Sequence, residues 1–122
     1  MPTELDTIFV HNLRVDAVIG VYDWEKEFKQ PLFFDIEMLT DIQASAATDD
    51  IHLTVSYKEV SDDVIEWVEA HQFELLETLA EQLSQLLLAK YLGIEQITLT
   101  VKKPQAVRQA ETVGLKITRR RV

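Results

Sequence analysis

The chain has 122 residues, of which 47% are hydrophobic, which is typical of one globular domain, here residues 1–122, and excludes a disordered segment. Its net charge of −9 argues against a nucleic-acid-binding surface. The absence of cysteine excludes disulfides, thiolate metal sites, iron–sulfur clusters and a cysteine nucleophile.

Two β-strands open the chain. Residues 7–22 are rich in β-branched side chains and alternate locally, which predicts one long strand with a bulge near Asn12. A charged connection closed by Pro31 comes next. Residues 32–39 then alternate well, which predicts the second strand of a hairpin with one apolar face made of Leu32, Phe34, Ile36 and Met38.

Two helices follow a linker or short helical turn at 44–50. Ser56, with a glutamate three residues later, forms a capping box and predicts the start of a helix. Apolar residues at helical spacing extend that helix to about Ala70. A leucine-rich stripe predicts a second helix over 74–92, and Gly93 is expected to be its C′ stop.

Two further strands close the chain, over 95–103 and 112–120, and Pro104 ends the first of them because it cannot donate to the ladder. The element order ββααββ predicts an α+β fold in which two helices cover one face of a four-stranded antiparallel sheet. The sheet edges and the second face, with outward residues such as Phe9 and Phe33, stay available. We therefore expect protomers to associate, edge to edge, into a closed ring.

Metal and phosphate sites are not indicated. His11, His52 and His71 are far apart and lack the spacing of metal ligands, and the three glycines are isolated. We therefore expect no metal and no cofactor.

The N-terminal segment MPTELDTIF lacks the basic and apolar stretches of a secretory signal. No apolar run approaches the roughly 20 residues of a membrane helix. We expect a cytoplasmic protein without membrane or nucleic-acid partners. The terminal basic run Arg119–Arg121 is expected to be solvated.

Four polar residues lie at element ends, where active sites tend to form: Glu25, Tyr57, Glu77 and Lys103. Each also has an ordinary structural interpretation. A glutamate in the first turn of a helix, for example, complements the helix dipole. Lys102 and Lys103 point to opposite faces of a strand, so at most one of them faces a given site.

Five short motifs together resemble the dihydroneopterin aldolase family. They are IGVYDWE, FDIEM, VSY, LLETLAE and KPQAV, and they occur in the family's order from about Ile8 to Ile117. The lysine–proline version of the last motif is similar to one branch of the family. Members outside that branch often carry a histidine before the glycine that is here Gly20; this chain has Ile19, so no role is given to a histidine there.

The resemblance implies a T-fold, whose protomers assemble into rings, often two stacked tetramers, with active sites between neighbouring protomers. It also implies cleavage of 7,8-dihydroneopterin into 6-hydroxymethyl-7,8-dihydropterin and glycolaldehyde in folate biosynthesis. The ring N5=C6 bond of this substrate is already an imine that can accept electrons. The reaction then requires neither a metal nor a lysine Schiff base, and it allows epimerisation at C2′ as a side activity.

The resemblance implies that Glu77 binds the guanidine-like edge of the pterin through its carboxylate, which suits a pair of N–H donors. The backbones of Leu76 and Val55 are expected to supply further ring contacts.

Lys103 is implied to be the catalytic general acid and base, and it is preferred over Lys102 because it directly precedes the proline. Tyr57, from the neighbouring protomer, is expected to orient the substrate hydroxyls and relay a proton. Glu25 is expected to contact the substrate near Lys103. Two alternatives stay open: a dihydroneopterin triphosphate 2′-epimerase, and a non-catalytic pterin-binding module that forms rings.

Overall fold

The computed structural model describes residues 4–121. Its single sheet has the order β1-β2-β3-β4, and every neighbouring pair is antiparallel. The strands are β1 (Asp6–Ala17), β2 (Gln30–Thr40), β3 (Gln96–Lys103) and β4 (Val113–Arg120). Two hairpins thus flank the helical segment, which confirms the predicted α+β fold and its element order.

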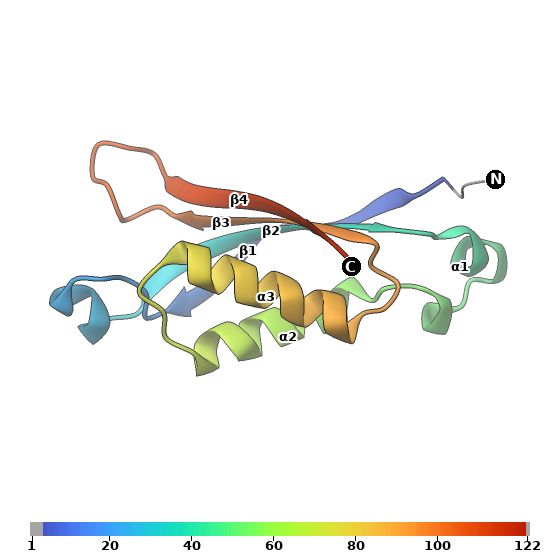
Figure 1. Ribbon diagram of the computed structural model, residues 1–122, viewed down its shortest axis with the longest axis horizontal. Coiled ribbons are helices and arrows are strands. Elements are labelled where there is room, and N and C mark those ends of the chain that lie inside the picture. Colours follow the sequence, from blue (N-terminus) through green and yellow to red (C-terminus); the bar gives the residue numbers. More distant parts are fainter. Residues whose placement is uncertain (1–3, 122) are drawn as a thin grey trace.

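Helices α2 (Tyr57–Ala70) and α3 (Leu76–Lys90) lie antiparallel beneath one face of the sheet (Figure 1). The 3₁₀ turn η1 (Asp23–Glu27), the β3–β4 loop and the start of α3 lie at one end of the molecule. Helix α1 (Gln43–Thr48), the turn η2 (Ile51–Leu53) and the start of α2 lie at the other end. Across residues 4–121, no helix combines the length and apolarity that a membrane span needs.

The core lies between the sheet and the two helices. The four predicted inward residues of β2 are fully buried, as are Ile97, Leu99 and Val101 of β3. They meet the predicted helical stripes, whose buried members are Val60, Val64, Val68, Leu79, Leu83 and Leu87. Each such side chain contributes about 1.5–3 kcal/mol by leaving water, so the alternation of β2 and β3 fixes which sheet face the helices cover.

The predicted bulge in β1 is confirmed at Asn12. The register shifts between Val10 and Leu13, and Asn12 takes the left-handed φ of 54°. Strand β1 nevertheless ends at Ala17 and does not continue to residue 22. The chain leaves the sheet because Ile19 forms a parallel bridge with Phe73, ahead of α3.

The expectation that Pro31 precedes the second strand is wrong, since β2 begins at Gln30. Pro31 is paired with Asp16 of β1, whereas β3 pairs with β2 only from Phe33 onward. The proline therefore lies outside the three-stranded part of the sheet, where the loss of one backbone donor is tolerated.

The predicted start of α2 is confirmed, whereas the predicted C-terminal end of α3 is wrong. Ser56 Oγ accepts a hydrogen bond from the Glu59 amide at 3.3 Å, as an N-cap does. Gly93 is not a left-handed C′ residue; α3 ends at Lys90, with Tyr91 as its C-cap. The Gly93 carbonyl instead accepts a hydrogen bond from Thr40 Oγ1 at 2.7 Å.

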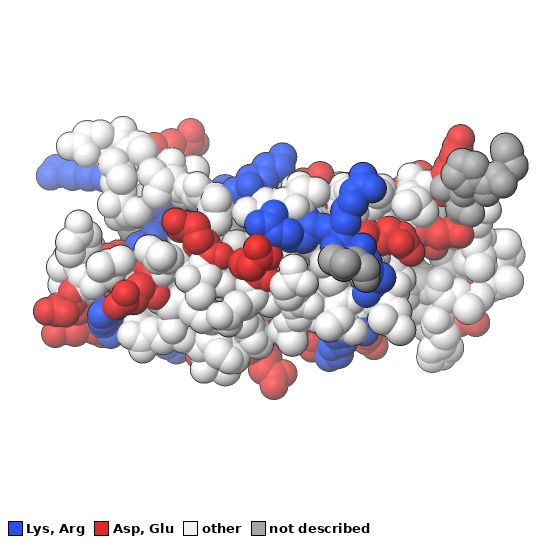
Figure 2. Space-filling model, in the orientation of Figure 1, with Lys and Arg blue, Asp and Glu red and all other residues white. Residues whose placement is uncertain are grey.

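The terminal basic run is solvated only at Arg120, which is exposed. Arg121 donates to the carbonyls of Leu88, Tyr91 and Ile94, at 2.6, 3.0 and 2.6 Å. Arg119 forms an ion pair with Glu81 of α3 at 2.9 Å. Figure 2 shows basic side chains gathered near the C-terminal end of β4 between acidic ones. Cations here satisfy the free carbonyls at the C-terminal end of a helix.

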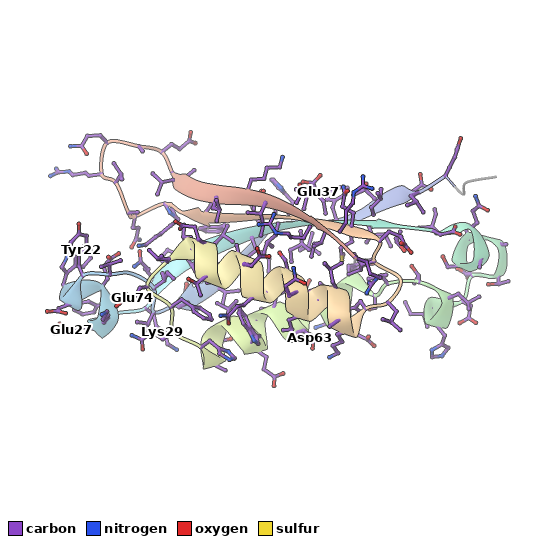
Figure 3. All side chains as sticks on the ribbon, in the orientation of Figure 1. Tyr22, Glu27, Lys29, Glu37, Asp63 and Glu74 are labelled. Carbon is purple, nitrogen blue, oxygen red and sulfur yellow. The ribbon has the colours of Figure 1, made fainter. Side chains whose placement is uncertain are left out.

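The second face of the sheet carries no helix within the described chain. Figure 3 shows Glu37 projecting from this face, away from α2 and α3. Phe9 is 66% exposed and Phe33 is half-buried. The outer edges of β1 and β4 have no strand partner among residues 4–121, so association through these edges stays a prediction.

Candidate active site

Lys103 ends β3 on the helix-covered face of the sheet. It shares that face with Val101, two residues earlier, because side chains alternate along a strand. Its neighbour across the ladder is Val113 of β4. The Lys103 side chain is only 12% exposed, and its Nζ lies 2.7 Å from Glu25 Oε2. Two residues 78 positions apart in sequence thus form a buried ion pair.

Glu25 reaches this pair from η1. Its side chain is 7% exposed, and its Oε1 accepts a hydrogen bond from the Tyr22 amide at 3.4 Å. Burial acts to raise the pKa of Glu25, but hydrogen bonds from Lys103, the Tyr22 backbone and Gln30 outweigh it and leave the pKa below its ordinary value. Glu25 is therefore ionised at neutral pH, with the Lys103 ammonium as its counterion.

The pair borders a cleft of about 390 Å³ between η1, the start of α3 and the β3–β4 loop. Leu76, at the start of α3, and Ala106, in the loop, also line it. Figure 3 shows Tyr22 and Glu74 at this end of the molecule. An ion pair between Lys26 and Glu74, 3.0 Å long, joins η1 to the segment before α3. The cleft therefore combines an apolar wall with a buried proton donor and a carboxylate.

Glu77 occupies the first turn of α3, one residue after Leu76, and its side chain is exposed. Both residues thus lie at the end of the molecule that carries the Lys103–Glu25 pair. Anionic side chains are also favourable in a first turn for helix-dipole reasons. Glu77 is not among the residues that line the cleft, whereas Leu76 is, so a ring-binding role for Glu77 stays a prediction.

Val55 and Tyr57 lie beside the start of α2, toward the opposite end of the molecule from the cleft (Figure 1). Val55 lines a different cavity, of about 480 Å³, together with Thr40, Tyr91 and Gly93. Tyr57 is 64% exposed. Within one chain, therefore, these two residues are not brought together with Lys103, Glu25 and Leu76, which share the cleft.

Lys102 points to the uncovered face of the sheet, as the strand alternation predicts. Its Nζ lies 3.0 Å from Asp35 Oδ2 and also donates to Asn12 Oδ1. Asp35 in turn accepts the backbone amide of Asn12 at 2.8 Å and lies 2.8 Å from His11 Nδ1. Lys102 therefore belongs to a polar network that joins the β1 bulge, β2 and β3 and lies outside the cleft.

Two residues near the pair were missed by sequence reasoning. Gln30 donates to the Ile19 carbonyl at 2.9 Å and acts to lower the pKa of Glu25. Gly20 has a φ of 141° and lies against the Glu25 carboxylate. Gly20 belongs to the motif IGVYDWE, so its position was a usable signal, whereas the contact of Gln30 depends on folding. Among residues 4–121, no group of three or more acidic or histidine side chains is arranged to hold a metal ion.

The antiparallel sheet with two helices on one face is a T-fold, and the buried lysine–glutamate pair at its cleft is suited to acid–base chemistry. These features define the class as T-fold proteins with a cleft that is bordered by a buried lysine–glutamate pair.

Comparisons with known proteins give the particular family. The family model for dihydroneopterin aldolase matches residues 8–118. The dihydroneopterin aldolase of Haemophilus influenzae is 42% identical over 115 residues, which cover 94% of this chain and 97% of that protein. The crystal structure of Escherichia coli dihydroneopterin aldolase in complex with neopterin has a TM-score of 0.90 at 39% identity, covering 93% of this chain and 98% of that one.

This chain belongs to the dihydroneopterin aldolase family. Members of an aldolase family that cleave carbon–carbon bonds are lyases, so the chain is an enzyme of that class. A crystal structure from Vibrio cholerae shares the fold across 99% of this chain and 100% of that one, with a TM-score of 0.92 and 36% identity. The family, the fold and the enzyme class expected from the sequence are confirmed.

Proposed function

We propose that the protein cleaves 7,8-dihydroneopterin into 6-hydroxymethyl-7,8-dihydropterin and glycolaldehyde, with the chemistry at the Lys103–Glu25 pair. The observation that carries this proposal is the buried 2.7 Å contact between Lys103 and Glu25 at the wall of a cleft. The names of the similar proteins, and the neopterin bound in the Escherichia coli structure, support a pterin as the substrate.

In the proposed reaction, the C1′–C2′ bond of the side chain breaks as the 2′-hydroxyl loses its proton. The electron pair of the bond moves through C6 to N5, which takes up a proton and becomes an enamine nitrogen. Protonation of C1′ and loss of the N5 proton then restore the imine and complete the hydroxymethyl product. The protein needs only to move protons and hold the ring.

Lys103 suits the acid–base role because its Nζ lies within hydrogen-bond distance of the ionised Glu25 at the wall of the cleft. Glu25 would hold Lys103 in place and contact the substrate side chain. Removing either member leaves the other charge buried without its partner, which is costly. The pair therefore favours one defined proton position before substrate binds.

Ring binding is assigned to the start of α3. The Glu77 carboxylate would accept two N–H donors from the pterin edge, and the Leu76 backbone would contact the ring. Leu76 lines the cleft, and Glu77 follows it on the first turn. Charge-assisted hydrogen bonds of this kind contribute about 1.5–3 kcal/mol.

A complete site would combine two protomers. Val55 and Tyr57 lie toward the end of the molecule that is remote from Lys103 (Figure 1). They can therefore contribute to the site at Lys103 only if a neighbouring copy of the chain presents them. Tyr57 would orient the hydroxyls and relay the proton to C1′, and the Val55 backbone would contact the ring. Pairing of exposed sheet edges into tetrameric rings, and stacking of rings into an octamer, would bring the two ends together.

The test is direct product analysis. Purified protein is mixed with 7,8-dihydroneopterin, and the products are separated and identified by mass. Equal amounts of 6-hydroxymethyl-7,8-dihydropterin and glycolaldehyde support the proposal. Binding without turnover indicates a binding module, and a C2′ epimer without cleavage indicates an epimerase.

A second experiment addresses how electrons are accommodated. A lysine that formed an imine with substrate would be trapped by borohydride. Because the substrate already contains the N5=C6 imine, borohydride added during turnover should leave the protein mass unchanged. A borohydride-dependent adduct on Lys103 would contradict the acid–base role.

A further inference from the structure

Gly20 lies directly against the carboxylate of Glu25. A Cβ built at Gly20 would lie 2.3 Å from Glu25 Cδ, 2.4 Å from Oε1 and 2.5 Å from Oε2, where ordinary contacts are 3.4–4 Å. Gly20 also has a φ of 141°, which L side chains rarely adopt. The bare backbone of Gly20 therefore forms one wall of the space that the Glu25 carboxylate fills.

The backbone at Gly20 is fixed from its other side. Its amide donates to the Phe73 carbonyl at 3.1 Å, and the preceding Ile19 forms a parallel bridge with the same residue. The Ile19 carbonyl accepts the Gln30 side chain at 2.9 Å, and the Ile19 side chain is 1% exposed. A side chain introduced at residue 20 cannot be accommodated by backbone retreat without breaking these contacts.

The carboxylate is the part that has to move. It is held by Lys103 Nζ at 2.7 Å and by the Tyr22 amide at 3.4 Å. Relieving a 2.3 Å approach to an ordinary contact requires a displacement of about 1 Å or more, which exceeds the tolerance of a hydrogen bond between Glu25 and Lys103.

We propose that Gly20 is a positioning residue for the Lys103–Glu25 pair. Because Gly20 has no side chain, the Glu25 carboxylate can occupy the position from which it orients Lys103. This inference rests on the proposed acid–base function of the pair. It adds that the geometry of the pair is set by a residue that contributes no functional group of its own.

The expected effect of Gly20→Ala is a fall in kcat of about 10²-fold, since a displacement of about 1 Å of a catalytic group has that consequence. The dissociation constant for a pterin should change much less, because the ring is held by the start of α3. The pKa of Glu25, followed by carboxyl ¹³C NMR, should rise in the variant as contact with Lys103 is lost. A general loss of stability would not separate kcat from binding in this way.

The compensating variant is Glu25→Asp. Shortening the side chain by one methylene withdraws the carboxylate from residue 20 and makes room for a methyl group. We therefore expect Glu25→Asp to lower kcat markedly when residue 20 is glycine and to lower it little, or raise it, when residue 20 is alanine. Glu25→Gln, which keeps the shape and removes the charge, serves as the reference for loss of the pair.

The five proteins (the wild type, the three single variants and the double variant) are compared by kcat, pterin affinity and melting temperature at equal protein concentration. Equal kcat in Gly20→Ala and the wild type overturns the positioning role. The role is also overturned if the fall in kcat of the double variant equals the product of the falls in Gly20→Ala and Glu25→Asp, because the two substitutions then act independently. If Gly20→Ala does not fold, the double variant decides: folding with the kcat of Glu25→Asp supports the role, and failure to fold assigns Gly20 to backbone conformation alone. Unchanged kcat in Glu25→Gln would instead overturn the proposed function of the pair.

Discussion

Replacing Lys103 by alanine should leave a buried, ionised carboxylate without its partner. The Lys103 and Glu25 side chains are 12% and 7% exposed and 2.7 Å apart. Breaking a buried pair from one side costs about 3–5 kcal/mol, and we expect the lower end, about 3 kcal/mol, because the cleft admits water to the orphaned carboxylate. Removing both charges in Lys103→Ala/Glu25→Gln should recover most of that loss.

The pH dependence of this effect has a definite sign. The folded-state pKa of Glu25 lies below its ordinary value of 4.5, so the pair stabilises the wild-type fold above about pH 4.5 and loses this contribution as the pH falls through the folded-state pKa. The stability difference between the wild type and Lys103→Ala should therefore be largest near neutral pH and shrink as the pH falls, because Glu25 takes up a proton first in the variant, where Lys103 no longer offsets its burial.

The assay is urea unfolding at several pH values, with equal protein concentrations because association affects apparent stability. Equal unfolding midpoints for the wild type and Lys103→Ala at pH 7 would refute the buried-pair interpretation. A difference that grows as the pH falls below 4.5 would refute the assigned direction of the Glu25 shift.

Three further predictions concern the ring contact, the shared site and the core. Glu77→Gln should weaken pterin binding at least about tenfold; unchanged affinity by calorimetry would return Glu77 to a helix-dipole role. Tyr57→Phe and Lys103→Ala should each be impaired, and verified mixed oligomers should regain activity; no recovery would indicate a site within one protomer. Ser84 is buried, and its Oγ has no hydrogen-bond partner in the described part of the chain, so Ser84→Ala should raise the free energy of unfolding by about 1 kcal/mol, and a lower urea midpoint would contradict this.

Most of the fold could be predicted from local sequence patterns. The strict alternation of β2 and β3 and the Ser56 cap act over a few residues, so the sequence alone locates the sheet faces and the start of α2. The contacts of Arg121, Gly20 and Gln30 follow no such local pattern, because each partner lies in another segment of the chain. Gly93 was misread for the same reason: its carbonyl contact with Thr40 spans 53 positions.

The candidate site was predictable in part. Strand alternation placed Lys102 and Lys103 on opposite faces, and the contacts of Lys102 with Asp35 agree with that. The preference for Lys103 came from the family motif, in which the lysine directly precedes the proline. The direct pairing of Lys103 with Glu25 could not be derived from spacing, since it depends on how η1 folds back beside the end of β3. The contribution of Tyr57 stays a prediction because it requires a second copy of the chain.

The most direct test of the role of Lys103 is the rate of dihydroneopterin cleavage in two neighbouring lysine variants. Lys103→Ala should lower kcat by about 10²–10⁴-fold while pterin binding is largely kept. Lys102→Ala removes an equal charge from the other face of the same strand and should leave kcat near that of the wild type. Equal rates for Lys103→Ala and the wild type, or a greater loss in Lys102→Ala, would contradict the assignment of the chemistry to Lys103.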